Sequence, residues 1–259
     1  MLVKNILKEK MTKGVPVFGI WNTIASPIVT NVLAVGGCDF QILDLEHGPF
    51  ILNHIHEHVS ASESENCSLI VRVPSNQDWQ ILQALDQGAH GVVIPHIDTK
   101  KEVDNAAKYT KYYPEGERGF TPFSKPGGYT NTDKEYSKRA NELTVFVAII
   151  ESLEGLSNLD SILENKNVDV IYFGAYDLSQ ALGYPGEPKH PAVVERISEA
   201  VIKVNNAGKV AGGFVPQSTD DIEWNLKLGM KFITYQVDTN ILLRDITEKT
   251  KWLNDRYSS

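Results

Sequence analysis

Short apolar runs alternate along this chain with longer segments in which apolar residues recur every three or four positions. The apolar runs are Val17–Trp21, Phe40–Leu43, Leu69–Val73, Gly91–Pro95, Val145–Ile150, Val170–Phe173, Val210–Phe214 and Phe232–Tyr235. Because almost every residue within them is apolar, they predict parallel strands that are buried on both faces. The intervening segments predict helices near Pro27–Val35, Leu52–Ser64, Asp78–Asp86, Lys100–Lys111, Leu156–Glu164, Pro191–Asn206, Asp220–Leu228 and Asn240–Asn254.

Eight strand–helix alternations within 259 residues predict an α/β fold, a single (β/α)8 TIM barrel that spans residues 1–259 as one domain. An open, doubly wound sheet is the alternative. It is less favoured because no Gly-x-Gly-x-x-Gly motif follows the first predicted strand. One long stretch, Tyr112–Thr132, has no regular pattern. Loops of this length inside a compact domain are usually functional, so we expect a lid or a contact between subunits there.

The charge and the cysteines narrow the class of protein. A formal net charge of −8 argues against non-specific binding to nucleic acid or to anionic membranes. No apolar run approaches the roughly 20 residues of a membrane-spanning helix, and the charged first ten residues do not resemble a signal peptide. Cys38 and Cys67 form no Cys-x-x-Cys motif, which suits a reducing compartment. We therefore expect a cytoplasmic protein.

Polar side chains follow the predicted strands at the end where barrel enzymes carry their active sites. These strand-end residues are Trp21, Asp44-Leu45-Glu46-His47-Gly48, Arg72, His96, Glu151, Gly174-Ala175-Tyr176-Asp177, Phe214 and Gln236-Val237-Asp238. Carboxylates, an arginine and histidines are thus predicted to converge on one mouth, which indicates an enzyme.

Glu151 and Asp177 end neighbouring predicted strands, so we expect the two carboxylates to lie close together. Two carboxylates in a partly buried mouth repel each other, and a divalent cation offsets that repulsion. Carboxylates with several open coordination positions suit Mg²⁺ or a similar hard ion. The alternative is that each carboxylate only caps a helix or a turn.

His47 and Arg72 are the candidates for moving protons and binding negative charge. A histidine at a strand end can act as a general base near neutral pH, and Asp86 is the candidate carboxylate that orients it. Arg72 lies in an otherwise apolar strand, and its guanidinium suits a carboxylate or a developing enolate. The alternatives are a structural His47 bonded to a backbone carbonyl, and an Arg72 salt bridge to Glu46 or Asp44.

Two other signals are weaker. His54, His56 and His58 invite a zinc interpretation, but the spacing is not His-Glu-x-x-His, so we expect a solvated helix surface instead. Lys125 lies beside Pro126 in a polar loop, away from the apolar surroundings that lower the pKa of a Schiff-base lysine.

Several of these residues belong to motifs that occur together in one order. The motifs are Gly19-Ile20-Trp21, Asp44-Leu45-Glu46-His47-Gly48-Pro49, Val71-Arg72-Val73-Pro74, Leu85-Asp86-Gln87-Gly88-Ala89, Tyr113-Pro114-Glu115-Gly116-Glu117-Arg118-Gly119, Ile150-Glu151 and Gly174-Ala175-Tyr176-Asp177-Leu178-Ser179. This series resembles the HpcH/HpaI aldolase family, the class II pyruvate aldolases. The family includes 4-hydroxy-2-oxoheptanedioate and 2-dehydro-3-deoxyglucarate aldolases, and the similarity covers nearly the whole chain.

The resemblance implies a metal-dependent carbon–carbon lyase. It implies that Glu151 and Asp177 hold Mg²⁺, Mn²⁺ or Co²⁺, which a 2-oxo acid chelates through its carboxylate and ketone. The backbone N–H groups of residues 174–177 would receive the carboxylate of that acid. The reaction would cleave or form a 4-hydroxy-2-oxo acid from pyruvate and an aldehyde through an enolate.

The resemblance also implies roles for the remaining site residues. Arg72 would stabilise the enolate oxygen, and His47, made more basic by Asp86, would manage protons through water. Trp21, Asp44, Gly174 and Tyr176 would contact the substrate from the same mouth. Family members are usually hexamers, so we expect a homo-oligomer, a trimer or a hexamer, with the C-terminal helix packed on a neighbouring subunit.

Some residues depart from the family pattern, and other functions compete. Ile149 stands where heptanedioate-type members carry Gln, and Tyr176 stands where Ala is common, which leaves the identity of the aldehyde open. A lyase for acyl-CoA substrates, similar to citrate lyase β and malyl-CoA lyase, is one alternative. It needs a basic cluster for the coenzyme arm, and the predicted mouth offers none. A non-catalytic barrel is the other alternative, and the retained set of site residues disfavours it.

Overall fold

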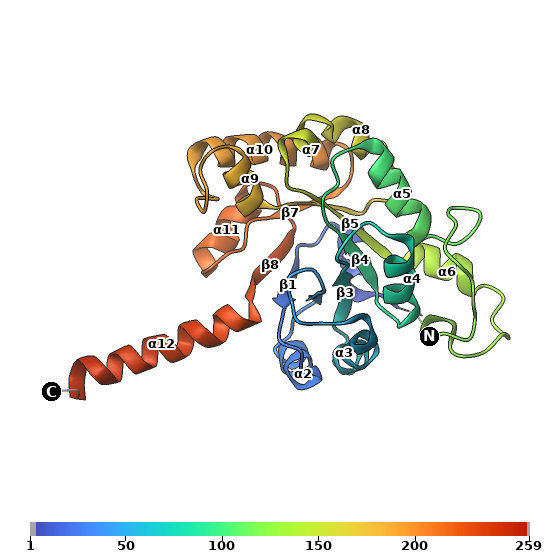
Figure 1. The fold of residues 1–259 in the computed structure, drawn as a ribbon, viewed down its shortest axis with the longest axis horizontal. Coiled ribbons are helices and arrows are strands. Elements are labelled where there is room, and N and C mark those ends of the chain that lie inside the picture. Colours follow the sequence, from blue (N-terminus) through green and yellow to red (C-terminus); the bar gives the residue numbers. More distant parts are fainter. Residues whose placement is uncertain (1–3, 258–259) are drawn as a thin grey trace.

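The apolar runs form parallel strands that pair in sequence order and close into a barrel, with β8 against β1 (Figure 1). This computed structural model describes residues 4–257. The strands are β1 (Val17–Asn22), β2 (Phe40–Asp44), β3 (Ser68–Arg72), β4 (Gly91–Ile94), β5 (Val145–Ile150), β6 (Val170–Phe173), β7 (Val210–Gly213) and β8 (Phe232–Val237). The predicted (β/α)8 fold is confirmed.

A helix follows each strand, and all of these helices except the last cover the outside of the barrel (Figure 1). They are α2 (Pro27–Val35), α3 (Ile55–Glu63), α4 (Asp78–Asp86), α5 (Lys100–Thr110), α7 (Leu153–Ser157), α8 (Leu159–Leu163), α10 (Pro191–Asn206), α11 (Thr219–Lys227) and α12 (Asp238–Tyr257), with 3-10 turns η1 (Leu52–His54) and η2 (Lys125–Gly127). Three further helices were not predicted: α1 (Ile6–Thr12), α6 (Tyr136–Leu143) and α9 (Ala175–Ala181). Each has at most eight residues, too few to show a clear helical period.

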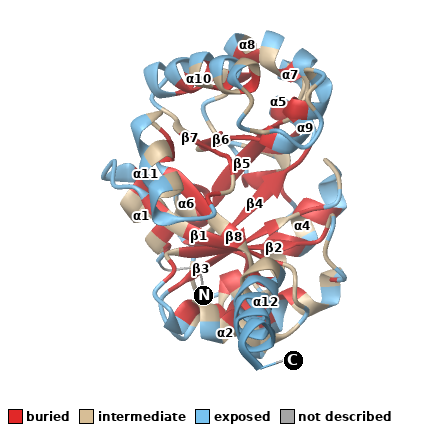
Figure 2. Cartoon of the chain, turned by 90° about the vertical axis from the view of Figure 1, so that its left-hand side faces the viewer, coloured by how far each residue is buried: buried red, intermediate tan, exposed pale blue. Residues whose placement is uncertain are grey.

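Alternation along each strand divides the core into two parts. On β5, Val145, Val147 and Ile149 join the cluster inside the barrel, while Phe146 and Ala148 join the layer between strands and helices. Figure 2 shows the buried strands at the centre and the exposed outer faces of the helices around them. Because side chains fill the barrel interior, the barrel is a rigid frame that presents its strand ends in fixed positions.

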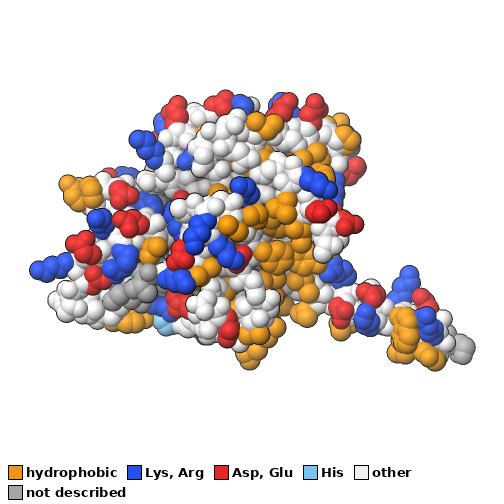
Figure 3. All heavy atoms as spheres, turned by 180° about the vertical axis from the view of Figure 1, so that it is seen from behind, with side chains coloured by type: hydrophobic (Ala, Val, Ile, Leu, Met, Phe, Trp, Pro, Cys, Tyr) orange, Lys and Arg blue, Asp and Glu red, His pale blue; other side chains and the backbone are white. Residues whose placement is uncertain are grey.

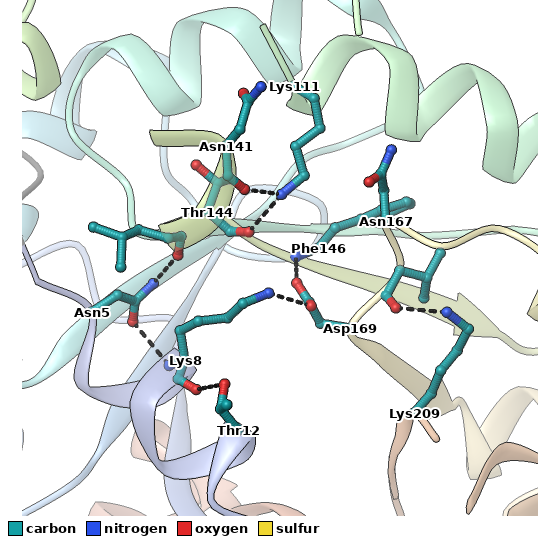
Figure 4. Close-up of polar contacts among 12 residues, drawn as sticks. Asn5, Lys8, Thr12, Lys111, Asn141, Thr144, Phe146, Asn167, Asp169 and Lys209 are labelled. Atoms are coloured by element: carbon teal, nitrogen blue, oxygen red, sulfur yellow. Dashed lines mark hydrogen bonds and ion pairs between the residues drawn. The ribbon is translucent and has the colours of Figure 1, made fainter. Parts of the chain in front are cut away.

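A polar network ties the amino-terminal helix to the base of the barrel (Figure 4). The Asn5 side chain donates to the carbonyls of His90 (2.9 Å) and Leu143 (2.8 Å). Lys8, one turn into α1, forms an ion pair with Asp169, whose other oxygen accepts the N–H of Phe146 at 2.9 Å. The helix α1 therefore holds the loops that enter β4, β5 and β6.

The last helix, α12, projects away from the barrel (Figure 1). Leu242, Leu243, Ile246, Trp252 and Leu253 are exposed along it. Figure 3 shows hydrophobic side chains near the far end of the projecting helix and a broad hydrophobic area on the barrel near its base. The prediction that α12 packs on a neighbouring subunit is untested in a single chain. Among the described residues, no helix is long and apolar enough to cross a membrane.

The expectation of a solvated surface for the His54–His58 segment is wrong for its last member. His58 is buried on α3 and its Nδ1 lies 2.6 Å from the hydroxyl of Thr30 on α2. Burial lowers the pKa of His58 to about 4, so the imidazole is neutral at physiological pH. His56 is exposed, in agreement with the expectation.

Candidate active site

The carboxyl ends of the strands surround a cavity of about 520 Å³. Every predicted site residue except Asp86 lines it: Trp21, Asp44, His47, Arg72, Glu151, Gly174, Tyr176 and Asp177. These residues come from five separate strand ends, which the closed barrel places around one mouth. Strand-end residues of a barrel share one site, and this rule predicted from the sequence which residues line the cavity.

Arg72, the last residue of β3, is held by two carboxylates. Its Nε donates to Asp44 Oδ1 at 2.8 Å and its Nη2 to Asp44 Oδ2, while Nη1 lies 3.0 Å from Glu46 Oε2. The guanidinium also lies over the ring of Trp21, 4.5 Å from its centroid. Both salt bridges considered as alternatives are present, and the guanidinium still lines the cavity. The ion pairs fix the orientation of Arg72.

Asp44 also shapes the loop that carries His47. Its Oδ1 accepts the backbone N–H groups of Glu46 (3.0 Å) and His47 (3.2 Å). The His47 side chain is 72% exposed, and its Nε2 lies 4.0 Å from Glu46 Oε2. His47 is thus a candidate general acid or base at the rim, where its imidazole can exchange protons with water and with a substrate in the cavity.

Glu151 follows β5, and Asp177 lies in the first turn of α9, which follows β6. Burial raises the pKa of Glu151, and the negative charges of Asp177 and Glu46 raise it further, while His96 opposes the shift. Gly174 makes room for Glu151: a Cβ atom at this glycine would lie 2.7 Å from the Glu151 Cβ and 3.0 Å from Oε2. A side chain at residue 174 would therefore displace the carboxylate.

The two carboxylates fit a divalent cation. They share one cavity, and burial together with the negative charge of Asp177 raises the pKa of Glu151, so a cation near the two carboxylates is favourable. Within residues 4–257, no group of three or more His, Cys, Asp or Glu side chains is arranged as a complete metal site. A two-carboxylate set that leaves positions for water and substrate oxygens is the kind that Mg²⁺ and similar hard ions occupy.

His96 was predicted to lie at a strand end, but the sequence analysis gave it no role. It follows β4, and its Nδ1 lies 2.7 Å from Glu151 Oε1, while its Nε2 lies 3.2 Å from Glu46 Oε1. The only signal in the sequence was its position after Pro95 at a predicted strand end. That signal does not distinguish it from any other polar residue at the mouth.

The floor of the cavity is apolar and uncharged. Ile149 and Tyr172 point inward from β5 and β6. The Tyr172 hydroxyl lies 2.7 Å from Thr234 and accepts the Trp21 indole N–H at 3.4 Å. Burial raises the pKa of Tyr172, which keeps the phenol neutral. This floor excludes water beneath the charged rim, which strengthens electrostatic interactions there.

Asp86 lies outside the residues that line the cavity. It ends α4, and its Oδ1 accepts from Arg118 Nη2 at 2.6 Å. Arg118 in turn lies over the ring of Tyr112, 4.4 Å from its centroid. No hydrogen bond or ion pair joins Asp86 to His47 within the described chain. The role of Asp86 in orienting His47 therefore stays a prediction.

Comparison with known proteins shows the family to which the chain belongs. The profile of the HpcH/HpaI aldolase/citrate lyase family matches residues 17–244. A hydroxypyruvate/pyruvate aldolase from Roseobacter denitrificans is 32% identical over 242 residues, which are 92% of this chain and 93% of the relative. A 4-hydroxy-2-oxo-heptane-1,7-dioate aldolase from Salmonella dublin is 33% identical over 93% of this chain and 92% of its own length.

A solved structure agrees with this relationship. The HpcH/HpaI aldolase from Desulfitobacterium hafniense superposes with a TM-score of 0.92 at 27% identity, over 97% of each chain. The family profile and the relatives above 30% identity each cover nearly the whole barrel, including all the strands that form the mouth. The chain therefore belongs to the HpcH/HpaI aldolase/citrate lyase family and is an enzyme of the aldolase type.

Proposed function

We propose that this enzyme cleaves or forms a 4-hydroxy-2-oxo acid from pyruvate and an aldehyde through an enolate, with Mg²⁺, Mn²⁺ or Co²⁺ held by Glu151 and Asp177. The observation that carries the proposal is the pairing of these two carboxylates with Arg72 in one cavity. The name of the Roseobacter denitrificans relative, a hydroxypyruvate/pyruvate aldolase, supports a 2-oxo acid as the substrate.

The cation would supply a Lewis acid that polarises the ketone and offsets the charge of the enolate. The protein supplies the rest of the electrostatics. Arg72, fixed by Asp44 and Glu46, presents a preorganised positive charge where the enolate oxygen develops, so little reorganisation is needed as the charge forms. The N–H groups of residues 174–177 surround the start of α9 and would receive the substrate carboxylate.

His47 would transfer the proton. At the exposed rim it can take the proton of the 4-hydroxyl group directly or through one water, and return a proton to the enolate carbon. We keep Asp86 as the proposed group that raises the basicity of His47. Because its carboxylate pairs with Arg118 in one chain, that role requires a rearrangement or a second copy of the chain.

Trp21, Asp44 and Tyr176 would set the shape of the cavity around the bound substrates. Tyr176 is half-exposed at the rim, where its phenol narrows the side from which an aldehyde enters. The exposed apolar side chains of α12 support a homo-oligomer, a trimer or a hexamer, in which this helix packs on a neighbouring subunit. We propose a cytoplasmic location because both cysteines are free and buried.

The test is hydrogen–deuterium exchange of the pyruvate methyl group in D₂O. The reaction runs with metal, and the metal is removed before the NMR spectrum is recorded. Purified protein with Mg²⁺ or Mn²⁺ should exchange the methyl protons, and EDTA should stop the exchange. The experiment reports enolate formation without knowledge of the aldehyde, and a screen of aldehydes would follow. His47→Ala should slow the exchange strongly and leave metal affinity intact.

Absence of exchange with all three metals would refute pyruvate as the donor. A His47→Ala protein that no longer bound metal would refute the division of roles between His47 and the carboxylates. His54→Ala is the matched control, because His54 lies on η1 outside the residues that line the cavity.

A further inference from the structure

His96 contacts one oxygen of Glu151 through both its backbone and its ring. Its backbone N–H donates to Glu151 Oε1 at 2.8 Å, and its imidazole Nδ1 lies 2.7 Å from that atom. The other ring nitrogen, Nε2, lies 3.2 Å from Glu46 Oε1. The imidazole therefore bridges the two carboxylates, although most of its ring faces solvent.

The backbone at His96 adopts an uncommon conformation that makes this contact. Its φ angle is 54°, in the left-handed region that few residues other than glycine occupy. Immediately after it, the N–H of Ile97 donates to the carbonyl of Ile149 at 3.1 Å, which continues the pairing with β5. Such a conformation persists only where the surroundings impose it, and it often marks a functional site.

Glu46 contacts the ring nitrogen of His96 that faces away from Glu151. Its Oε1 faces His96 Nε2, and its Oε2 lies 3.0 Å from Arg72 Nη1. The Glu46 side chain is mostly buried, so its carboxylate is held by these two partners. A continuous set of contacts thus runs from Arg72 through Glu46 and His96 to Glu151.

The two carboxylate oxygens of Glu151 have different contacts. Oε1 accepts the backbone N–H of His96 and lies 2.7 Å from its Nδ1, whereas Oε2 is the atom beside Gly174. No side chain or backbone group of the described residues donates a hydrogen bond to Oε2. One oxygen of the carboxylate is therefore anchored, and the other remains for a ligand in the cavity.

We propose that His96 is a positioning residue that fixes the orientation of the Glu151 carboxylate, which would hold a divalent cation. It anchors Oε1, and Glu46 holds its ring in place. Residues that orient a metal ligand typically change metal affinity by 10–100-fold when they are removed. The inference rests on the proposed function only in taking Glu151 as a metal ligand.

The test measures Mn²⁺ affinity directly, by titration calorimetry and by the EPR signal of free Mn²⁺. We expect His96→Ala to weaken Mn²⁺ binding by roughly 10–100-fold. The Mn²⁺ concentration that half-saturates pyruvate exchange should rise by the same factor. His96→Asn should restore part of the affinity, because asparagine tolerates a positive φ angle and its amide can donate to Glu151. His56→Ala, at an exposed histidine on α3, is the matched control and should bind Mn²⁺ like the wild type.

Unchanged Mn²⁺ affinity in His96→Ala would overturn the proposal, even if the variant were less stable. Pulsed EPR that showed a histidine nitrogen bound to Mn²⁺ in the wild type, and its loss in His96→Ala, would also overturn it, because His96 would then be a ligand. Weakened Mn²⁺ binding in a protein that exchanges no pyruvate protons would support the positioning role while refuting the proposed substrate.

Discussion

The two ends of this barrel carry similar charged side chains, but these side chains differ in whether they have partners within the protein. At the base, Lys8 pairs with Asp169, and Lys111 donates to the carbonyls of Asn141 and Thr144 (Figure 4). Lys209 donates to two carbonyls of the loop before β6. Each ammonium group at the base thus has a partner in the protein.

At the mouth the partners are unequal. Arg72 is shared between Asp44 and Glu46. Glu151 is bonded to His96, and no lysine or arginine forms an ion pair with Glu151 or Asp177 within residues 4–257. Burial raises the pKa of Glu151, and the negative charge of Asp177 adds to the shift. Charges at the base have partners that stabilise the fold, whereas the two carboxylates at the mouth lack a lysine or arginine partner among the described residues, as expected of a functional site.

The largest effect expected from this difference is that of Glu151→Gln. The variant removes one proposed metal ligand and the repulsion with Asp177. Pyruvate exchange should fall by at least roughly 10³-fold, because the Lewis acid contributes several kcal/mol to the transition state. The melting temperature without metal should stay the same or rise, since the largely buried charge of Glu151 and its repulsion with Asp177 are removed.

The measurement pairs the exchange assay with thermal unfolding in EDTA. Asp169→Asn is the contrasting variant at the base: it should lower the melting temperature and leave Mn²⁺ affinity unchanged. If Glu151→Gln unfolded at a much lower temperature instead, the mouth would be structural like the base, and the comparison would fail.

Much of this contrast could be predicted from the sequence, because it follows from the barrel. Apolar runs on both faces predict parallel strands, and a closed barrel brings their ends together. Glu151 and Asp177 were predicted as neighbours on that ground alone, and both line the cavity. The metal itself was an inference from the chemistry of two carboxylates.

What the sequence could not predict depends on side-chain directions and on local backbone angles. His96 contacts Glu151 only because its φ angle is 54°, and no pattern in the sequence indicates that value. Asp86 precedes a glycine in a family-like motif, yet in the folded chain its carboxylate faces Arg118. His58 shares a helix face with His54, but packing against Thr30 of α2 decides that His58 is buried.

Arg72→Lys sharpens the comparison at the mouth with a smaller effect. A lysine keeps the positive charge but loses the planar fork that Asp44 and Glu46 hold, so the charge is no longer fixed at the enolate oxygen. Loss of one preorganised donor costs about 10²–10³-fold in rate. We expect pyruvate exchange to slow by that factor at saturating Mn²⁺. Exchange close to the wild-type rate would show that charge alone suffices.

The smallest expected effect concerns Lys111 and tests whether the base is fully satisfied. Burial lowers the pKa of Lys111 to about 8 from 10.5, although Asp169 opposes the shift. Below pH 8 the lysine is charged in both folded and unfolded chains, and the folded state bears the full cost of burying the charge. As the pH rises above 8, the folded protein releases this proton first, while the unfolded chain keeps it up to about pH 10.5. The contribution of Lys111 to stability therefore increases with pH in this window.

Urea unfolding of the wild type and of Lys111→Met, measured in EDTA between pH 8 and pH 10, isolates this contribution. The difference in the free energy of unfolding between the two proteins should grow by roughly 2–3 kcal/mol in favour of the wild type across that range. Lys111→Met removes this titrating group, and the two proteins share every other titratable group, so the difference between them isolates Lys111. Parallel curves would mean that Lys111 remains charged in the folded protein, with its two carbonyl partners and Asp169 compensating for burial. In that case the base would hold its charges as fully as its hydrogen bonds indicate, and the contrast with Glu151 at the mouth would be sharper still.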